Sequence, residues 1–213
     1  MATGLFTHEL CARHQMGESH PESPQRLASI FDFLRASGLF SELVQHEAPV
    51  VEREALLRAH PEHYLAMLER LLPQQGLAWA DPDTALNEFT LDAAARAAGA
   101  ATAAVRAVMS GSLTNAFCAV RPPGHHAEHA RVMGFCFHNN VAVGVHEALA
   151  AGLVTRCVPR AALADTVESL ARRLAGFEPA VLRAAKRALH EGADLPLPQA
   201  LRLEARLAAV HAT

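Results

Sequence analysis

A short apolar run at residues 116–120, Ala-Phe-Cys-Ala-Val, restricts the possible folds more than any other feature of the sequence. A continuously apolar run of this length is typical of a strand that is buried on both faces of a parallel sheet. An alanine-rich helical pattern at 91–109 precedes it, and a second helix is predicted over 138–150. Helices that alternate with buried strands in this way indicate an open α/β sheet.

The rest of the first 150 residues fits the same architecture. One helix is expected to have Ser23 as its N-cap and Pro24 in its first position, and to end at Gly38. The other predicted elements are strands at 3–10 and 43–51, short helices at 53–59 and 61–72, and a loop at 73–90.

The composition changes after His146. Eleven of the 13 histidines lie at or before that residue, and Phe177 is the only aromatic residue that follows it. The later part is rich in Ala, Leu and Arg, and its pattern predicts a short strand at 153–158 and three amphipathic helices. We therefore expect an α/β domain over residues 1–150 and an all-helical tail over residues 151–213.

Residues that could take part in catalysis directly follow the predicted central strand. Pro122 and Pro123 favour an extended backbone after the strand, and Gly124 allows a tight turn. His125 and His126 are therefore expected just past the carboxyl end of a central strand, where open α/β sheets bind ligands. Two imidazoles there suit proton transfer, because their pKa lies near neutrality. A His-His pair by itself is also common as an exposed loop feature or as half of a chance metal chelate.

Four segments together carry a family resemblance: RPPGHHA at 121–127, MGFCFHNN at 133–140, HPESPQRL at 20–27 and DPDT at 81–84. Over about residues 3–150 the chain resembles the histone deacetylase and acetylpolyamine amidohydrolase family, especially its class II and bacterial members. The resemblance implies an arginase/deacetylase fold, in which a parallel sheet lies between helical layers. It also implies hydrolysis of acetyl-lysine or a related amide by a zinc-bound water. His138 departs from the family, which usually has an aromatic or aliphatic residue there.

The same resemblance implies roles for individual residues. His125 and His126 match the catalytic tandem histidines that hydrogen-bond the zinc-bound water, and His126 matches the general base. Gly134 and Phe135 match substrate-binding positions that line the acyl-lysine tunnel, and an aromatic wall suits an aliphatic stem. Asp83, in the segment DPDT, matches a loop at the rim of the pocket. The expected substrate is an acetylated amine or lysine.

The family's zinc ligands have no counterpart in this sequence. They are an Asp-x-His on the strand after the helix at 138–150 and a later Asp, and this chain contains no Asp-x-His. The family's transition-state tyrosine has no counterpart either, since Tyr64 is the only tyrosine and lies far upstream. A catalytic zinc takes three protein ligands and keeps one open position. We therefore assign no metal ligands, and expect zinc not to be bound and turnover to be small or absent.

The tail has a resemblance of its own. From about 147 to 213 the chain, with LVTRCVP at 153–159 and the helical pattern at 161–207, resembles the carboxyl-terminal end of the enoyl-CoA hydratase (crotonase) family. In that family these helices pack against the main body and help to build trimers, and the catalytic groups lie upstream. The expected fold class is thus α/β, a truncated arginase/deacetylase-like parallel sheet with flanking helices followed by an all-helical tail. A fusion of two incomplete genes explains this arrangement, and an artefact of assembly or design is equally compatible with it.

Several functional alternatives stay open at this point. The chain is a deacetylase-family amidohydrolase, a non-catalytic remnant or interaction module, or an acyl-CoA-related module based on the tail. A zinc site improvised from His125, His126, Glu128, His129 and His138 is a further alternative. Self-association through the incomplete sheet or the tail helices is expected.

Composition excludes other classes of function. Charged residues make up 19% of the chain and the net charge is −3, which gives no sign of nucleic-acid binding. No apolar run of 18 residues is present, so no membrane span is predicted. The first twenty residues do not read as a secretory signal, and a reducing cytoplasmic setting is expected.

Overall fold

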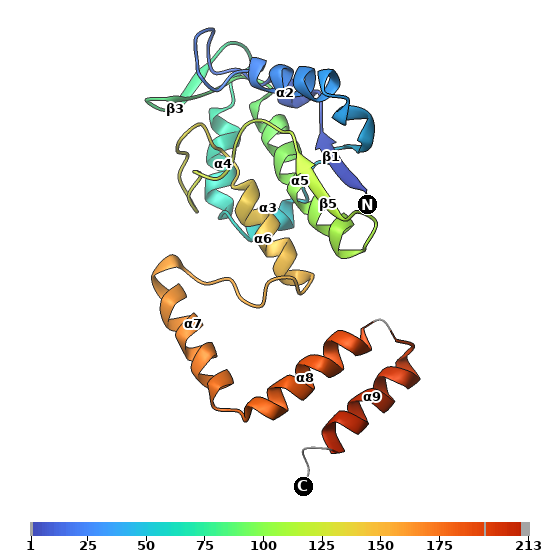
Figure 1. The fold of residues 1–213 in the computed structure, drawn as a ribbon. Coiled ribbons are helices and arrows are strands. Elements are labelled where there is room, and N and C mark those ends of the chain that lie inside the picture. The colour runs from blue at the N-terminus through green and yellow to red at the C-terminus, as the bar shows by residue number, and fades with distance from the viewer. Residues whose placement is uncertain (1, 194, 210–213) are drawn as a thin grey trace. The chain divides into compact units, whose positions relative to one another are not determined.

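The computed structural model describes residues 2–193 and 195–209, and it divides into two compact units, Met1–Cys157 and Val158–Thr213 (Figure 1). The first unit contains all the strands found in the described residues, and the second contains three helices. No helix in the described part of the chain is long and apolar enough to cross a membrane.

A three-stranded parallel sheet is the centre of the first unit. Strand β1 (Thr3–Thr7) lies in the middle, with β2 (Leu43–Glu47) on one side and β5 (Asn115–Cys118) on the other. Leu5 is opposite Gln45 on β2 and Phe117 on β5. The prediction of a parallel α/β sheet is confirmed, although each strand is shorter than predicted. Strand β2 stops before Pro49, which has no N–H to donate to the sheet.

Alternate residues of β1 bury on opposite faces of the sheet. Leu5 packs with Cys11 and Leu27, and Phe6 packs with Ala100 and Ala104. The helices of the first unit are α1 (Leu10–Arg13), α2 (Gln25–Ala36), the 3-10 helix η1 (Leu39–Glu42), α3 (Arg53–Leu57), α4 (Glu62–Leu71), α5 (Thr90–Met109) and α6 (Asn140–Ala150). Helices α2 and α5 thus supply apolar side chains to the two faces. The prediction that the strand at 116–120 is central and buried on both faces was wrong, because β5 is an edge strand of the described sheet and Phe117 is 46% exposed.

Two further predictions for this unit were wrong. Pro24, not Ser23, occupies the N-cap of α2, and no side chain caps the helix; the Ser23 carbonyl instead accepts a hydrogen bond from the Arg26 N–H. The predicted loop at 73–90 contains an antiparallel hairpin of β3 (Ala78–Asp81) and β4 (Thr84–Leu86). The hairpin forms because all three residues of β4 are buried, and burial requires their backbone groups to be paired.

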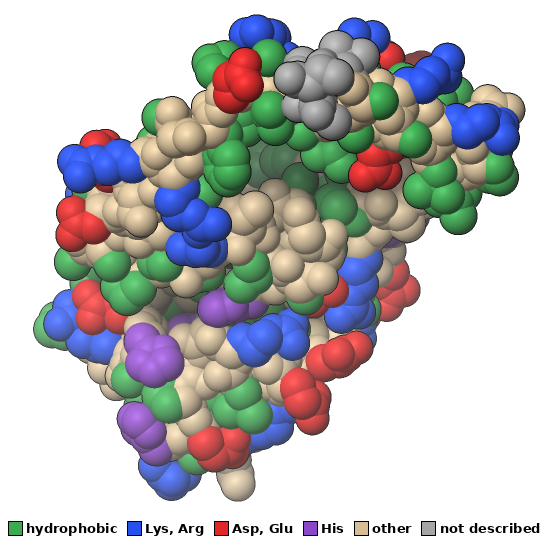
Figure 2. Space-filling view, turned by 90° about the horizontal axis from the view of Figure 1, so that it is seen from below, with side chains coloured by type: hydrophobic (Ala, Val, Ile, Leu, Met, Phe, Trp, Pro, Cys, Tyr) green, Lys and Arg blue, Asp and Glu red, His purple; other side chains and the backbone are tan. Residues whose placement is uncertain are grey.

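The second unit consists of α7 (Arg160–Ala175), α8 (Pro179–Gly192) and α9 (Leu197–Ala209). None of the described residues of these helices is buried. A groove of about 880 Å³ lies between α8 and α9 and is lined mainly by Ala and Leu, and Figure 2 shows hydrophobic side chains around such a hollow. The strand predicted at 153–158 does not form, because among the described residues this segment has no neighbouring strand to pair with.

A cluster of buried rings joins α3 and α4 to the start of α6. His60 Nε2 accepts a hydrogen bond from the Asn139 N–H (2.8 Å), and its Nδ1 donates to the His129 carbonyl (2.9 Å). Tyr64 stacks on His60 and donates to the Phe137 carbonyl. Burial lowers the pKa of His60, and burial together with the nearby His60 lowers the pKa of His138 to about 4. Both imidazoles are therefore neutral at pH 7.

These neutral histidines make stability depend on pH. The folded pKa of each lies below the ordinary value of 6.5, so the stabilisation is complete above pH 6.5 and is lost as the pH falls below it, in the case of His138 towards pH 4. We expect the free energy of unfolding to fall by at most ~1.4 kcal/mol per pH unit for each group. Urea denaturation at pH 7, 6 and 5 measures this slope.

A matched pair of variants identifies the residues responsible. His138→Leu should flatten the slope, whereas His63→Gln, at an exposed position of α4, should leave it unchanged. A slope that is the same in all three proteins would contradict the assignment.

Candidate functional site

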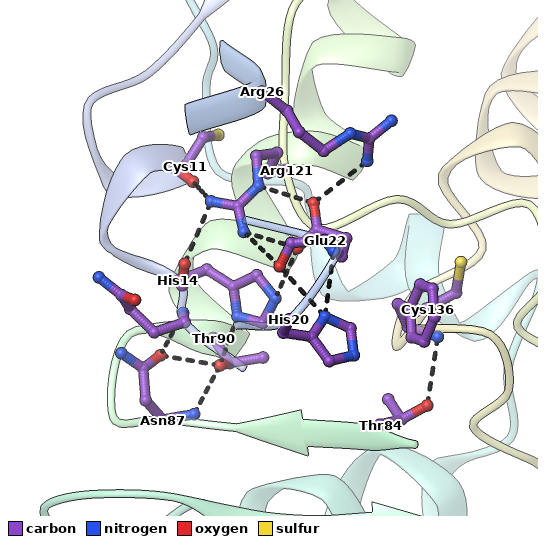
Figure 3. Close-up of polar contacts among 12 residues, drawn as sticks. Cys11, His14, His20, Glu22, Arg26, Thr84, Asn87, Thr90, Arg121 and Cys136 are labelled. Carbon is purple, nitrogen blue, oxygen red and sulfur yellow. Dashed lines mark hydrogen bonds and ion pairs between the residues drawn. The ribbon is translucent and has the colours of Figure 1, made fainter. Parts of the chain in front are cut away.

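A buried ion pair joins the two sequence motifs. Arg121, which follows β5, donates from Nε and Nη2 to the two carboxylate oxygens of Glu22, both at 2.6 Å (Figure 3). Its Nη1 donates to the backbone carbonyls of Cys11 (2.9 Å) and His14 (3.1 Å). Both side chains are almost completely buried, at 3% and 1% exposed. One guanidinium thus ties the residues after β5 to the loop between α1 and α2.

The electrostatics of this pair are unusual for a buried carboxylate. Burial alone would raise the pKa of Glu22, but hydrogen bonding by His14 and Arg121 outweighs it and lowers the pKa to about 2. His14 Nε2 lies 3.5 Å from Glu22 Oε2, and its Nδ1 lies 2.8 Å from Thr90 Oγ1 at the start of α5. Burial lowers the pKa of His14 itself. Glu22 is therefore a fixed anion at pH 7 and Arg121 is its counter-charge.

The tandem histidines follow β5, but β5 is an edge strand of the described sheet and not the central strand that was predicted. Beyond Arg121 the backbone turns at Gly124, where a Cβ would overlap the side chain of Asn140 and the carbonyl of His138. The rings of His125 and His126 are 4.1 Å apart between centroids, tilted by 49°, and both residues are exposed. Two adjacent, solvent-accessible imidazoles at this edge can exchange protons with a bound ligand.

The loop with Gly134 and Phe135 packs against His126. Gly134 has φ +56°, and a Cβ on it would lie 2.8–2.9 Å from three carbon atoms of His126. Phe135 also has a positive φ of 68°, which is uncommon for a bulky residue. Its N–H donates to Thr84 Oγ1 (3.2 Å), which holds this conformation in place. Glycine is thus required for the loop to approach the histidine.

The hairpin turn at Asp83 is connected to the Gly134–Phe135 loop through His20. His20 contacts the Phe135 ring edge-on, with centroids 4.6 Å apart, and its Nε2 lies 3.2 Å from the Asp83 carbonyl. The Asp83 carboxylate is exposed and accepts a hydrogen bond from Thr84 Oγ1 (3.0 Å). The five predicted site residues, which are His125, His126, Gly134, Phe135 and Asp83, are therefore linked in a chain of contacts through His20 and Thr84. Their functional roles stay predictions.

The residues that hold this arrangement together were not predicted from the sequence. Glu22 and Arg121 are 99 positions apart, and nothing in either motif indicates its partner. His20 and Glu22 lie within the quoted segment HPESPQRL, and Thr84 within DPDT, so membership in a motif was the only available signal.

The candidate metal ligands among the described residues do not come together. Among the described residues, no three His, Cys, Asp or Glu side chains form a group that could hold a metal. The predicted alternative cluster does not assemble either, because His129 Nδ1 donates to the Ala59 carbonyl (2.7 Å) and His138 is buried. The Tyr64 hydroxyl is also engaged within the protein, because it donates a hydrogen bond to the Phe137 carbonyl at 2.7 Å.

Comparison with known proteins identifies the family of the chain. The family model of the histone deacetylase domain matches residues 20–158. The chain belongs to this family. A probable deacetylase of Archaeoglobus fulgidus is 38% identical over 147 residues, which cover 68% of this chain and 40% of that protein. A histone deacetylase-like amidohydrolase of Pseudomonas aeruginosa is 34% identical over 165 residues, covering 70% and 43% of the two chains.

Solved structures confirm the deacetylase-like fold. The crystal structure of the HDA15 HD domain superposes with a TM-score of 0.67 at 33% identity, covering 71% of this chain and 44% of that one. The chain thus spans about two fifths of the length of each of these three proteins. A second family model, enoyl-CoA hydratase/isomerase, matches residues 113–212, which is less than half of the chain and overlaps the deacetylase match.

Breaking the buried pair should be strongly destabilising. Arg121→Ala leaves the Glu22 carboxylate buried without its counter-charge, and we expect the free energy of unfolding to fall by about 3–5 kcal/mol. Arg26→Ala is the matched control, because Arg26 is 59% exposed and only approaches Glu22 at 3.5 Å. That variant should lose less than ~1 kcal/mol. Equal losses in urea denaturation would show that Arg121 does not have this role.

The contact between Gly134 and His126 gives a second prediction. Gly134→Ala should lower the free energy of unfolding by ~1–2 kcal/mol, because alanine disfavours a positive φ, and should displace the His126 ring. NMR of the histidine ring protons reports the displacement. Gly144→Ala in α6 is the control, since its Cβ would meet Ala101 at 3.4 Å and alanine favours a helix. An unchanged His126 signal in the Gly134 variant would contradict the packing described.

Proposed function

We propose that this chain is a non-hydrolytic member of the histone deacetylase family. Its first unit presents the tandem histidines and the Gly134–Phe135 loop to an acetylated amine or lysine, without a group that activates water for attack on the amide. One observation carries the proposal. His126 lies beside His125 and packs against Gly134, but the described residues contain no group of side chains that could hold a metal.

The chemistry of the histidine pair supports this proposal. A neutral imidazole can accept a proton from water, but unactivated water has a pKa of about 15.7, and a metal ion is what lowers it towards 7 in hydrolases of this kind. Stabilisation of a developing oxyanion needs donors aimed at it. Tyr64 does not serve, because it is buried and its hydroxyl already donates to Phe137. The pair can therefore bind and polarise a ligand without completing hydrolysis.

The tail supports a separate part of the proposal. We infer that the chain joins a deacetylase-like segment to a helical segment of crotonase type, and that the helices do not add acyl-CoA catalysis. The two family matches and the separation into units at Cys157–Val158 support this reading. Binding of coenzyme A by the full chain would instead favour an acyl-CoA-related function.

An amide hydrolysis assay tests the proposal. The full chain is incubated with an acetyl-lysine peptide and with an acetylated diamine, with zinc added, and compared with the His125→Ala/His126→Ala variant. We expect both proteins to release acetate at the same background rate. The relative from Pseudomonas aeruginosa serves as a reference that the assay detects deacetylation. Hydrolysis that a chelator and the His126→Ala substitution both abolish would overturn the proposal.

A further inference from the structure

Strand β2 has an open edge. It pairs with β1 on one side, and in the part of the chain that the structure describes no strand lies on its other side. The Ala48 N–H donates to the Thr7 carbonyl of β1, and the backbone groups of alternate residues in a strand point to the same side. Counting back from Ala48, the N–H and C=O groups of Gln45 and Glu47 therefore point away from β1. An edge of this kind is a template for one more strand.

A cavity of about 520 Å³ lies beside this edge, on the face of the sheet that α2 covers. Gln45 of β2 lines one side of it. The start and one face of α2 line the other side, at spacings of three and four residues, through Pro24, Ala28, Phe31 and Arg35. Further apolar lining comes from Leu5, Ala12, Leu27 and Phe40. An edge strand and a helix thus form the two walls of a mainly apolar groove.

The register of the sheet shows which side chain of an added strand would enter this groove. Leu5 is opposite Gln45 and packs against Leu27 of α2, so the Gln45 side chain lies on the α2 face. A residue directly opposite Gln45 on an added strand would lie on the same face, whereas its two neighbours would point to the other face. An aromatic ring at that position would meet Phe31 and Phe40, whose rings already pack edge-on at 6.3 Å between centroids.

The two ends of the groove carry opposite charges. Glu9, which follows β1, lines the cavity at the carboxyl end of the strands. Glu47 lies at the same end, and its side chain is 76% exposed although His8 contacts it. At the amino end, Arg35 lines the cavity and its Cζ atom is 5.1 Å from the ring centroid of Phe40, in the 3-10 helix that directly precedes β2. A strand in the groove would therefore meet carboxylates at one end and a guanidinium at the other.

We propose that the groove between β2 and α2 binds an extended peptide segment of another protein, which adds to β2 as an antiparallel strand and places one aromatic or long aliphatic side chain in the cavity. Backbone hydrogen bonds to β2 hold the segment, and the cavity selects the side chain. Antiparallel pairing is the more stable kind, and it brings the amino-terminal part of the segment to Glu47 and the carboxyl-terminal part to Arg35. The preferred pattern is therefore basic, apolar and acidic at alternate positions. This surface is independent of the proposed deacetylase-family function.

Short peptides test the proposal on the full chain by isothermal titration calorimetry. The parent peptide is acetyl-Thr-Lys-Thr-Phe-Thr-Glu-Thr-amide, in which Phe would lie opposite Gln45 and Lys opposite Glu47. We expect this peptide to bind, and replacement of its Phe by Ser to weaken binding at least about tenfold, because the buried ring is lost. Exchange of its Lys and Glu keeps the composition and should weaken binding about fivefold, because like charges then face each other.

Methylated backbone amides test the strand pairing itself. Two opposite residues whose backbone groups face each other exchange both of their hydrogen bonds. N-methylation of the Phe amide removes the hydrogen bond donated to Gln45 and should weaken binding about fivefold or more. The matched control is N-methylation of the preceding Thr, whose N–H points away from β2, and it should leave the affinity nearly unchanged.

Two variants of the protein test the position of the peptide. Ala28→Phe fills the cavity from α2 and should abolish binding of the parent peptide. Ser29→Phe is the matched control, because Ser29 is an exposed residue of α2 outside the cavity, and it should bind like the parent chain. Thermal unfolding shows whether each variant is folded.

The proposal is overturned if the parent peptide does not bind, or if the Ser peptide or the Ala28→Phe variant binds as well as the original pair. Equal effects of the two N-methyl groups would show that the peptide does not pair with β2. Tighter binding of the charge-exchanged peptide would show that the strand runs parallel to β2. Each of these results contradicts the proposal, and the peptide series carries the test by itself if a variant does not fold.

Discussion

The buried pair of Arg121 and Glu22 is the interaction on which the site depends. Arg121 follows a strand at one edge of the sheet, and Glu22 lies in the loop between α1 and α2. Because both side chains of the pair are almost completely buried, removing either partner would leave a charge in a low-dielectric interior. The same guanidinium holds the carbonyls of Cys11 and His14, so one side chain sets the position of the whole segment before α2.

That anchor brings together segments that are distant in sequence. With the HPESP loop in place, His20 contacts Phe135 and the turn at Asp83, and Gly134 allows its loop to reach His126. The arrangement places the Gly134–Phe135 loop against the tandem histidines. It does not include a group of metal ligands within the described residues. Family membership and catalytic capacity are therefore separate questions in this chain, as they are wherever function depends on a few residues of a shared fold.

The sequence predicted the parallel sheet, the main helices and the location of the histidine pair, because apolar periodicity and the RPPGHHA motif are local signals. The hairpin at 78–86 escaped prediction because its strands are three and four residues long and interrupted by a bulge. The strand expected at 153–158 did not form, since strand formation depends on a neighbour that a local pattern does not reveal. The Glu22–Arg121 pair was missed for the same reason, as its residues are 99 positions apart.

Zinc content tests the central claim most directly. The claim is that a deacetylase-family scaffold here holds the tandem histidines without a metal site. The purified full chain is loaded with zinc, dialysed, and analysed by elemental mass spectrometry beside the His125→Ala/His126→Ala variant. The account predicts essentially no zinc in either protein. About one zinc per chain, lost when the two histidines are replaced, would show that the chain forms a metal site and would contradict it.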